Sequence, residues 1–157
     1  MSVKPIPEGY HTITAQLNID GAAAAIDFYV EAFGAEEEGR MAMPDGSIAH
    51  AAIRVHDAPV YLADAPADMP GDAGSPTKLG GSTVMVMQYV ADVDAVVARA
   101  EQAGATVVRA PEDQFYGDRS SMIVDPFGHH WAFHTHIREV GPEEMQQAME
   151  QAMEQTG

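Results

Sequence analysis

The sequence predicts an α+β fold: two tandem βαβββ modules whose concave mixed sheets surround a shared cavity, followed by a C-terminal helix. A helical stripe that starts after an Asp and stops at a Gly occurs twice, from Asp20 to Gly34 and from Asp92 to Gly104. One strand-like run precedes each stripe and three follow it. Because a unit of about 60 residues has little core of its own, the two units should pack together.

The first module is predicted to cover residues 10–64, after an irregular lead-in over residues 1–9. Residues 10–19 alternate apolar and polar side chains, which is typical of a strand with one buried face. Asp20 is the expected N-cap of the following helix, and Gly34 is its expected stop. Pro44-Asp45-Gly46 and His56-Asp57 are the expected turns between the remaining strands. These strands are predicted over residues 37–43, 47–55 and 59–63.

A linker is predicted over residues 65–81, which are rich in Pro, Gly, Ala and Asp. The second module, residues 82–137, then repeats the first. Asp92 is its expected N-cap, and Trp131 should face its helix. The tail, residues 138–157, contains a methionine stripe at helical spacing and is expected to pack on a neighbouring surface or a second subunit. The strands of the second module are predicted over residues 82–90, 105–109, 120–124 and 130–136.

The composition excludes several classes of function. The formal net charge of −16 argues against nucleic acid and anionic membranes, because phosphate binding requires a basic surface. The chain has no Cys, so it cannot form disulfides or use a thiol in catalysis. No apolar run is long enough to span a membrane, and no secretory signal is visible. A soluble cytoplasmic protein is therefore expected.

Several motifs, in this order and spacing, resemble those of the vicinal oxygen chelate superfamily. They are residues 25–29 (Ala-Ile-Asp-Phe-Tyr), 33–35 (Phe-Gly-Ala) and 125–128 (Asp-Pro-Phe-Gly). That superfamily includes glyoxalase I, extradiol dioxygenases, and fosfomycin- and bleomycin-resistance proteins. Residues 43–46 (Met-Pro-Asp-Gly), His50 and residues 114–119 are most similar to its PhnB-like branch.

The resemblance also implies four strand positions at which metalloenzymes of the superfamily hold one divalent ion. These positions fall on Thr14, Tyr61, Met85 and Ala132, which are poor ligands for a metal that prefers imidazole and carboxylate. The standard metal site is therefore expected to be missing, and no cofactor is predicted. An alternative site for Zn²⁺, Ni²⁺ or Mn²⁺ could use His50 and His134, with Gln16 as a further ligand. Without a metal, these histidines would instead be neutral and hydrogen-bonded in a polar pocket.

Arg119 has two interpretations, because its guanidinium could clamp an anionic ligand or pin its own acidic loop. Tyr116 could cap a pocket or close the adjacent turn. His11, His56 and His129 are expected at the surface. The residues predicted to bind a ligand are Gln16, His50, Tyr61, Met85, Met87, Tyr116, Arg119 and His134.

The leading functional hypothesis is a small-molecule-binding protein that lacks the standard metal site. The chain is expected to form a homodimer, because many relatives of the superfamily build their concavity by pairing modules between chains. The alternative is a metal-dependent lyase, isomerase or dioxygenase of the same superfamily. A third hypothesis is an interaction module whose contact is the methionine-rich tail. The sequence leaves open whether the chain catalyses a reaction, and it names no ligand.

Overall fold

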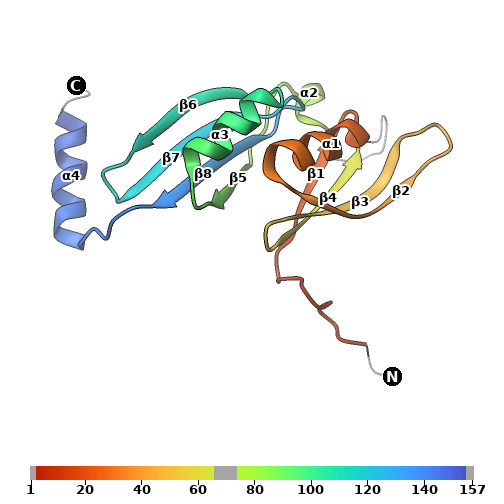
Figure 1. The fold of residues 1–157 in the computed structure, drawn as a ribbon, viewed down its shortest axis with the longest axis horizontal. Helices are drawn as coiled ribbons and strands as arrows, with labels where there is room; N and C mark the ends of the chain where they lie inside the picture. The colour runs from red at the N-terminus through yellow and green to blue at the C-terminus, as the bar shows by residue number, and fades with distance from the viewer. Residues whose placement is uncertain (1–2, 66–73, 155–157) are drawn as a thin grey trace.

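The computed structural model describes residues 3–65 and 74–154, which form two similar modules and a C-terminal helix (Figure 1). Each module has one four-stranded mixed sheet, and the strand orders β1-β4-β3-β2 and β5-β8-β7-β6 correspond. The predicted α+β fold with two tandem βαβββ modules is therefore confirmed. Sheet A contains β1 (Ala15–Ile19), β2 (Glu36–Ala42), β3 (Ile48–Val55) and β4 (Ala58–Asp64); sheet B contains β5 (Met85–Tyr89), β6 (Thr106–Asp113), β7 (Asp118–Val124) and β8 (His130–His136).

In each sheet the first strand pairs in parallel with the last strand of the same module. β1 pairs with β4 from Ala15 opposite Val60, and β5 pairs with β8 from Met85 opposite His130. The other pairings are antiparallel. This arrangement leaves β1 and β5 at the edges of their sheets.

The first strand is shorter than predicted, because β1 begins at Ala15 rather than at residue 10. Its pairing with β4 begins at Ala15 opposite Val60, although β4 itself begins at Ala58. Ile13 lies before the paired part of the strand and is 87% exposed, although its spacing suggested the core face.

The helix of the first module, α1 (Ala22–Phe33), is capped by a residue that is distant in sequence. Its N-cap position is Gly21, and the predicted Asp20 does not cap it. Instead, Oδ1 of Asp64 accepts hydrogen bonds from the backbone N–H groups of Gly21 and Ala22, at 2.8 and 2.9 Å. Oδ2 of Asp64 accepts a third, 2.7 Å bond from Ile48 N–H, so one carboxylate joins α1, β3 and β4.

Asp20 instead holds the end of the segment between the modules. Its Oδ2 accepts a 2.8 Å hydrogen bond from the hydroxyl of Ser75, and it also bonds Thr77. Ser75 is the N-cap of a single-turn helix, α2 (Pro76–Leu79), which the sequence did not predict within the linker. The remainder of the predicted linker, residues 66–73, lies outside the described residues.

In the second module, α3 (Val93–Gln102) begins as predicted, because the side chain of Asp92 accepts a 3.0 Å bond from Ala95 N–H. The helices α1 and α3 lie side by side, each over its own sheet (Figure 1). The guanidinium of Arg99 on α3 donates a 2.7 Å hydrogen bond to the carbonyl of Ala32 at the end of α1. The two modules therefore contact each other through their helices.

The core lies between the helices and the sheets. Trp131 and Phe133 of β8 are fully buried and pack against Phe33 of α1 at ring-centroid distances of 4.8 and 5.5 Å. The buried carboxylate of Asp125 accepts bonds from the hydroxyl of Tyr29 and from the indole N–H of Trp131, at 2.6 and 2.9 Å. The Asp-Pro-Phe-Gly turn thus supplies an acceptor inside the shared core.

The C-terminal helix α4 (Pro142–Glu154) extends beyond the β6–β7 end of sheet B (Figure 1). Arg138 connects it to the module by donating to Glu144 at 2.6 Å and to the carbonyl of Phe115 at 3.2 Å. None of the helices in the described residues is long and apolar enough to cross a membrane.

Candidate functional site

Each sheet has one face covered by its helix and one face turned away from it, which is called the open face here. On sheet B, Met85, Met87 and Tyr89 share the open face with His130, Ala132 and His134 of β8, because Trp131 and Phe133 face the helix. Met85 is 48% exposed, Met87 53% and Tyr89 62%. Large apolar side chains are therefore displayed beside histidines on this face.

A buried carboxylate that the sequence analysis missed organises the polar part of this face. Asp118, at the start of β7, is only 5% exposed. Its Oδ2 lies 3.1 Å from Nδ1 of His134 and accepts a 3.2 Å bond from the hydroxyl of Tyr89. Its Oδ1 lies 2.8 Å from Nδ1 of His136. We call Asp118, Tyr89, His134 and His136 the Asp118 cluster.

The charges of the Asp118 cluster follow from these contacts. Burial raises the pKa of Asp118, but the hydrogen bonds from His136, His134 and Tyr89 outweigh burial, so its pKa lies below the ordinary value. The hydrogen bonds to Asp118 and then to Glu139 raise the pKa of His136. The negative charge of Asp118 likewise raises the pKa of Tyr89. The carboxylate is therefore ionised and held by three donors.

His134 is the member of this cluster best placed to contact a ligand. Its side chain is 11% exposed, and its Nδ1 is directed at Asp118. Among the hydrogen bonds of the described residues, its other ring nitrogen, Nε2, has none. The rings of Tyr89 and Tyr116 lie 5.6 and 6.4 Å from the imidazole, between ring centroids. His134 thus presents one nitrogen between two tyrosines, in an orientation that Asp118 fixes.

The open face of sheet A carries the other predicted residues of the first module. The ring of His50 meets that of Tyr61 edge to face, with centroids 4.7 Å apart. Tyr61 is paired in register with Gln16, and the ring of Tyr10 lies 5.9 Å from it. The structure therefore brings Gln16, His50 and Tyr61 together on sheet A, whereas Met85, Met87, Tyr116 and His134 lie at sheet B.

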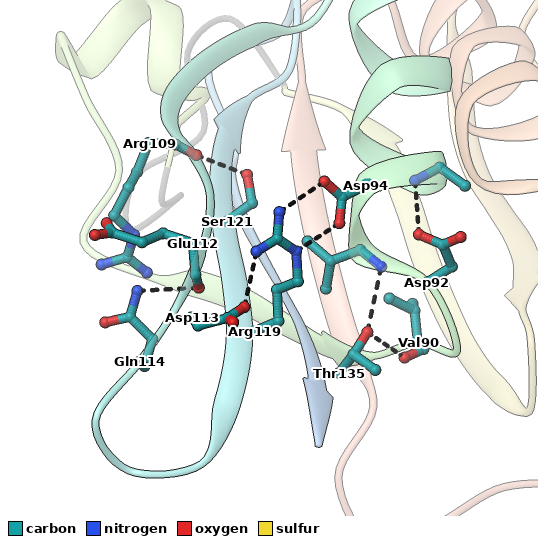
Figure 2. Close-up of polar contacts among 12 residues, drawn as sticks. Val90, Asp92, Asp94, Arg109, Glu112, Asp113, Gln114, Arg119, Ser121 and Thr135 are labelled. Atoms are coloured by element: carbon teal, nitrogen blue, oxygen red, sulfur yellow. Dashed lines mark hydrogen bonds and ion pairs between the residues drawn. The ribbon is translucent and has the colours of Figure 1, made fainter. Parts of the chain in front are cut away.

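Arg119 does not belong to either open face. It is paired with Thr135, on the helix side of sheet B (Figure 2). Its guanidinium donates two bonds to Asp94 of α3, at 2.6 and 2.9 Å, and one of 2.7 Å to Asp113. Hydrogen bonds to these two carboxylates raise its pKa and engage all three of its nitrogens. The predicted role as an anion clamp is not supported by this geometry; Arg119 instead ties the β6–β7 hairpin to α3.

A groove of about 640 Å³ lies between the modules, bordered by the edge strands β1 and β5 and by α2. Of the predicted ligand-binding residues, only Gln16 lines it. His129 also lines it but is buried, with Nε2 3.1 Å from the carbonyl oxygen of Asn18. The prediction that His129 is a surface group was therefore wrong, because the Asp-Pro-Phe-Gly turn packs against β1.

The residues at the superfamily's metal positions do not fit a divalent ion. Met85 and Ala132 lie on the open face of sheet B and Tyr61 lies on that of sheet A, and none offers a carboxylate or imidazole. The alternative pair, His50 and His134, is divided between the two sheets. Among residues 3–65 and 74–154, no three His, Cys, Asp or Glu side chains are arranged to hold a metal ion.

Two tandem βαβββ modules with opposed helix-covered and open faces define a vicinal oxygen chelate fold. The chain belongs to the Glyoxalase/Bleomycin resistance protein/Dioxygenase superfamily, whose family model matches residues 11–133.

Relatives with this sequence pattern occur in bacteria and plants. An uncharacterized protein of Mycobacterium tuberculosis strain H37Rv is 49% identical over 141 residues, which cover 87% of this chain and 81% of that protein. An uncharacterized Arabidopsis thaliana protein is 31% identical over 115 residues, covering 69% of this chain and 68% of that protein.

Solved structures show the same fold. TioX from Micromonospora sp. ML1 is similar with a TM-score of 0.63 and 26% identity, over 81% of this chain and 99% of that chain. A PhnB protein from Bacillus cereus has a TM-score of 0.59 and 16% identity, over 80% of this chain and 99% of that chain. At that identity, the likeness to the PhnB protein shows a shared fold.

Proposed function

We propose that this chain is a small-molecule-binding protein that holds its ligand on the open face of sheet B without a metal at the standard positions. The observation that carries the proposal is the position of His134, fixed by the buried Asp118 carboxylate, beside the exposed Met85, Met87 and Tyr89. Sites for small molecules usually combine an apolar lining with a few oriented polar groups. Methionine side chains adapt to ligands of different shapes.

Each group has a definite role in this proposal. Met85 and Met87 contact the apolar body of the ligand, and the rings of Tyr89 and Tyr116 border it. Nε2 of His134 forms the orienting hydrogen bond, since Nδ1 already faces Asp118. Asp118 is a positioning residue, because its carboxylate faces Tyr89, His134 and His136 and is directed away from the ligand.

The test is a ligand screen that reads individual methionine methyl groups by NMR. Probes are phenol, catechol, p-hydroxybenzoate and hydroxyacetone, which combine small apolar bodies with hydroxyl groups. We expect saturable shifts of the Met85 and Met87 methyls with at least one probe. His134→Gln should weaken that binding at least tenfold, which corresponds to about 1.4 kcal/mol. Met149→Ala, on α4, is the matched control and should leave it unchanged.

Two outcomes would contradict the proposal. One is the absence of any saturable shift at Met85 or Met87 with the whole set. The other is the loss of probe binding in EDTA and its recovery when Zn²⁺, Ni²⁺ or Mn²⁺ is added. That result would support the metal-dependent enzyme instead. Binding that survives EDTA supports the metal-free site.

We also propose that the protein is a homodimer. The exposed apolar side chains Met41, Met85, Met87 and Tyr89 lie on both sheets, and the edge strands β1 and β5 have no further strand beside them among the described residues. Such surfaces are usually covered in an assembly. Light scattering during gel filtration should give the mass of two chains; the mass of one chain at tens of micromolar protein would exclude the dimer.

A cytoplasmic location stays a prediction from the sequence.

A further inference from the structure

The open face of sheet B also carries a cation, Arg109 of β6. Residues that lie opposite one another on neighbouring strands share a face of the sheet. Arg109 lies opposite Met122 of β7, Met122 lies opposite Ala132 of β8, and Ala132 lies opposite Met87 of β5. A row of four side chains therefore crosses the open face, with Arg109 at one end and Met87 at the other.

The guanidinium of Arg109 extends from this row toward the Asp118 cluster. Its Nη2 donates a 3.3 Å hydrogen bond to the hydroxyl oxygen of Ser120 on β7, and Ser120 lies opposite His134 on β8. Ser120 is fully buried, so its hydroxyl can hold Arg109 but cannot contact a ligand. Arg109 itself is exposed. The guanidinium therefore lies over β7, one strand away from His134.

Arg109 also differs from the other cations in what it binds. The chain has eight Lys and Arg residues, against 24 Asp and Glu. Arg99 donates to the carbonyl of Ala32, whereas Arg109 has neither a carboxylate nor a carbonyl partner among the described residues. The guanidinium has five N–H donors and Ser120 accepts one, so a pair of donors remains open. The other cations form ion pairs with carboxylates: Lys4, Arg40, Arg54, Lys78, Arg119 and Arg138.

We propose that Arg109 binds a carboxylate group of the ligand, so that the open face of sheet B takes small apolar carboxylates that also carry a hydroxyl group. This inference rests on the proposed function, because it adds a partner for the ligand's charge to the groups that hold its body and its hydroxyl. Two neighbouring N–H groups of a guanidinium match the two oxygens of a carboxylate. The anion clamp expected of Arg119 is thereby supplied by Arg109.

The arrangement sets the size and the charge of the ligand. Neighbouring strands lie about 4.8 Å apart, so β5 and β7 are separated by about 10 Å. A ligand that rests on Met85 and Met87 and places its carboxylate over β7 therefore needs a body of about one ring. A single open cation, on a protein with a net charge of −16, favours a singly charged carboxylate over a doubly charged phosphate.

Two acidic side chains share the open face with Arg109. The carboxylate of Asp118 is engaged by its three partners in the cluster. Glu112 lies opposite Ser120, but no ion pair joins it to Arg109 in the part of the chain that the structure describes. The charge of Glu112 should therefore weaken the binding of an anion without occupying Arg109.

The experiment compares p-hydroxybenzoate with its methyl ester, which keeps the ring and the hydroxyl group but carries no charge. Binding is read at the methyl groups of Met85 and Met87. At about pH 7, where the carboxyl group is ionised, p-hydroxybenzoate should bind at least fivefold more tightly than the ester. Its affinity should also fall as salt is raised from about 0.05 to about 0.5 M, whereas that of the ester should not.

Arg109→Gln should weaken the binding of p-hydroxybenzoate at least fivefold and leave that of the ester unchanged, which also shows that the variant is folded. Arg119→Gln is the matched control, because it makes the same change in charge on the helix side of the same sheet (Figure 2). It should leave both affinities unchanged. Glu112→Gln should strengthen the binding of p-hydroxybenzoate alone.

Three results would overturn the role of Arg109: equal affinities for the acid and the ester, equal weakening of both by Arg109→Gln, or the same weakening of the acid by Arg119→Gln. In each of them the methyl shifts would still support the ligand site itself. The absence of a methyl shift with every probe would overturn the proposed function, and this inference with it.

Discussion

The hydroxyl of Tyr29 donates a 2.6 Å hydrogen bond to Oδ2 of Asp125, 96 residues further along the chain. Tyr29 belongs to the helix of the first module and Asp125 to the last turn of the second. Burial, together with the charge of Asp125, raises the pKa of Tyr29 well above its usual value, so the phenol keeps the proton that it donates.

Tyr29→Phe should therefore destabilise the whole protein. A hydrogen bond to a charged group contributes about 1.5–3 kcal/mol, and the loss should appear in the urea dependence of unfolding. Tyr10→Phe is the control, because Tyr10 lies outside the core. Equal stabilities for the two variants would show that the bond between the modules contributes nothing.

Removing the cap of α1 should reveal which aspartate supplies it. Asp64→Ala leaves three backbone N–H groups without their acceptor. Asp20→Ala removes only the acceptor of the Ser75 and Thr77 hydroxyls and the ion pair with Lys78. We expect a loss of about 1–2 kcal/mol or more for Asp64→Ala in urea unfolding, and a smaller loss for Asp20→Ala. The reverse order would contradict the capping described for α1.

The stability contributed by His136 should depend on pH. Since contact with Asp118 and Glu139 raises its pKa in the folded state, this contribution is fully present below the unfolded pKa of about 6.5 and is lost as the pH rises through the folded pKa. The advantage of the unmodified protein over His136→Gln, measured by urea unfolding, should be larger near pH 5.5 than near about pH 9. A constant difference would show that folding does not change the pKa of His136.

Arg119→Gln separates the two interpretations of this residue. Its carboxylate partners Asp94 and Asp113 are largely exposed, so the loss of stability should stay within about 1 kcal/mol and shrink at high salt. Affinity for any probe of the sheet B site should not change. A tenfold weaker affinity, measured by the methyl shifts, would restore Arg119 as a ligand-binding residue.

Gly117 should tolerate alanine far less than Gly46 does. Both have positive φ, 98° and 89°, so each Gly→Ala change carries backbone strain of about 1–2 kcal/mol. A Cβ at Gly117 would also overlap the carbonyl oxygen of Arg138, whereas Gly46 has open space around it. We expect about 1–3 kcal/mol of additional loss at Gly117 in thermal unfolding. Similar melting temperatures would show that the segment around Arg138 moves aside freely.

The fold was predictable because its signals are local. Asp and Gly at the helix ends, and alternation in the strands, repeat in both modules, so the architecture and most strands could be inferred. The start of β1 could not, because the alternation continues through residues 10–14 although the pairing with β4 begins only at Ala15. The cap of α1 could not be predicted either, because Asp64 follows Gly21 by 43 residues and reaches it only after β4 is paired.

The candidate site was predicted in part. The alternation of β8 placed His134 on the open face, and its side chain does lie there. The same alternation, extended into β7, could have placed Asp118 opposite His136 and Arg119 opposite Thr135 on the helix side.

The parallel pairing of β1 with β4 sets the order in which this chain can fold during synthesis. β1 cannot pair with β4 until Val60 has left the ribosome, and β5 cannot pair with β8 until His130 has done so. The first sheet can therefore close while the second half is still being made. Tyr29 must then remain without its acceptor until Asp125 appears, so the last step of folding closes the core of the part that was made first.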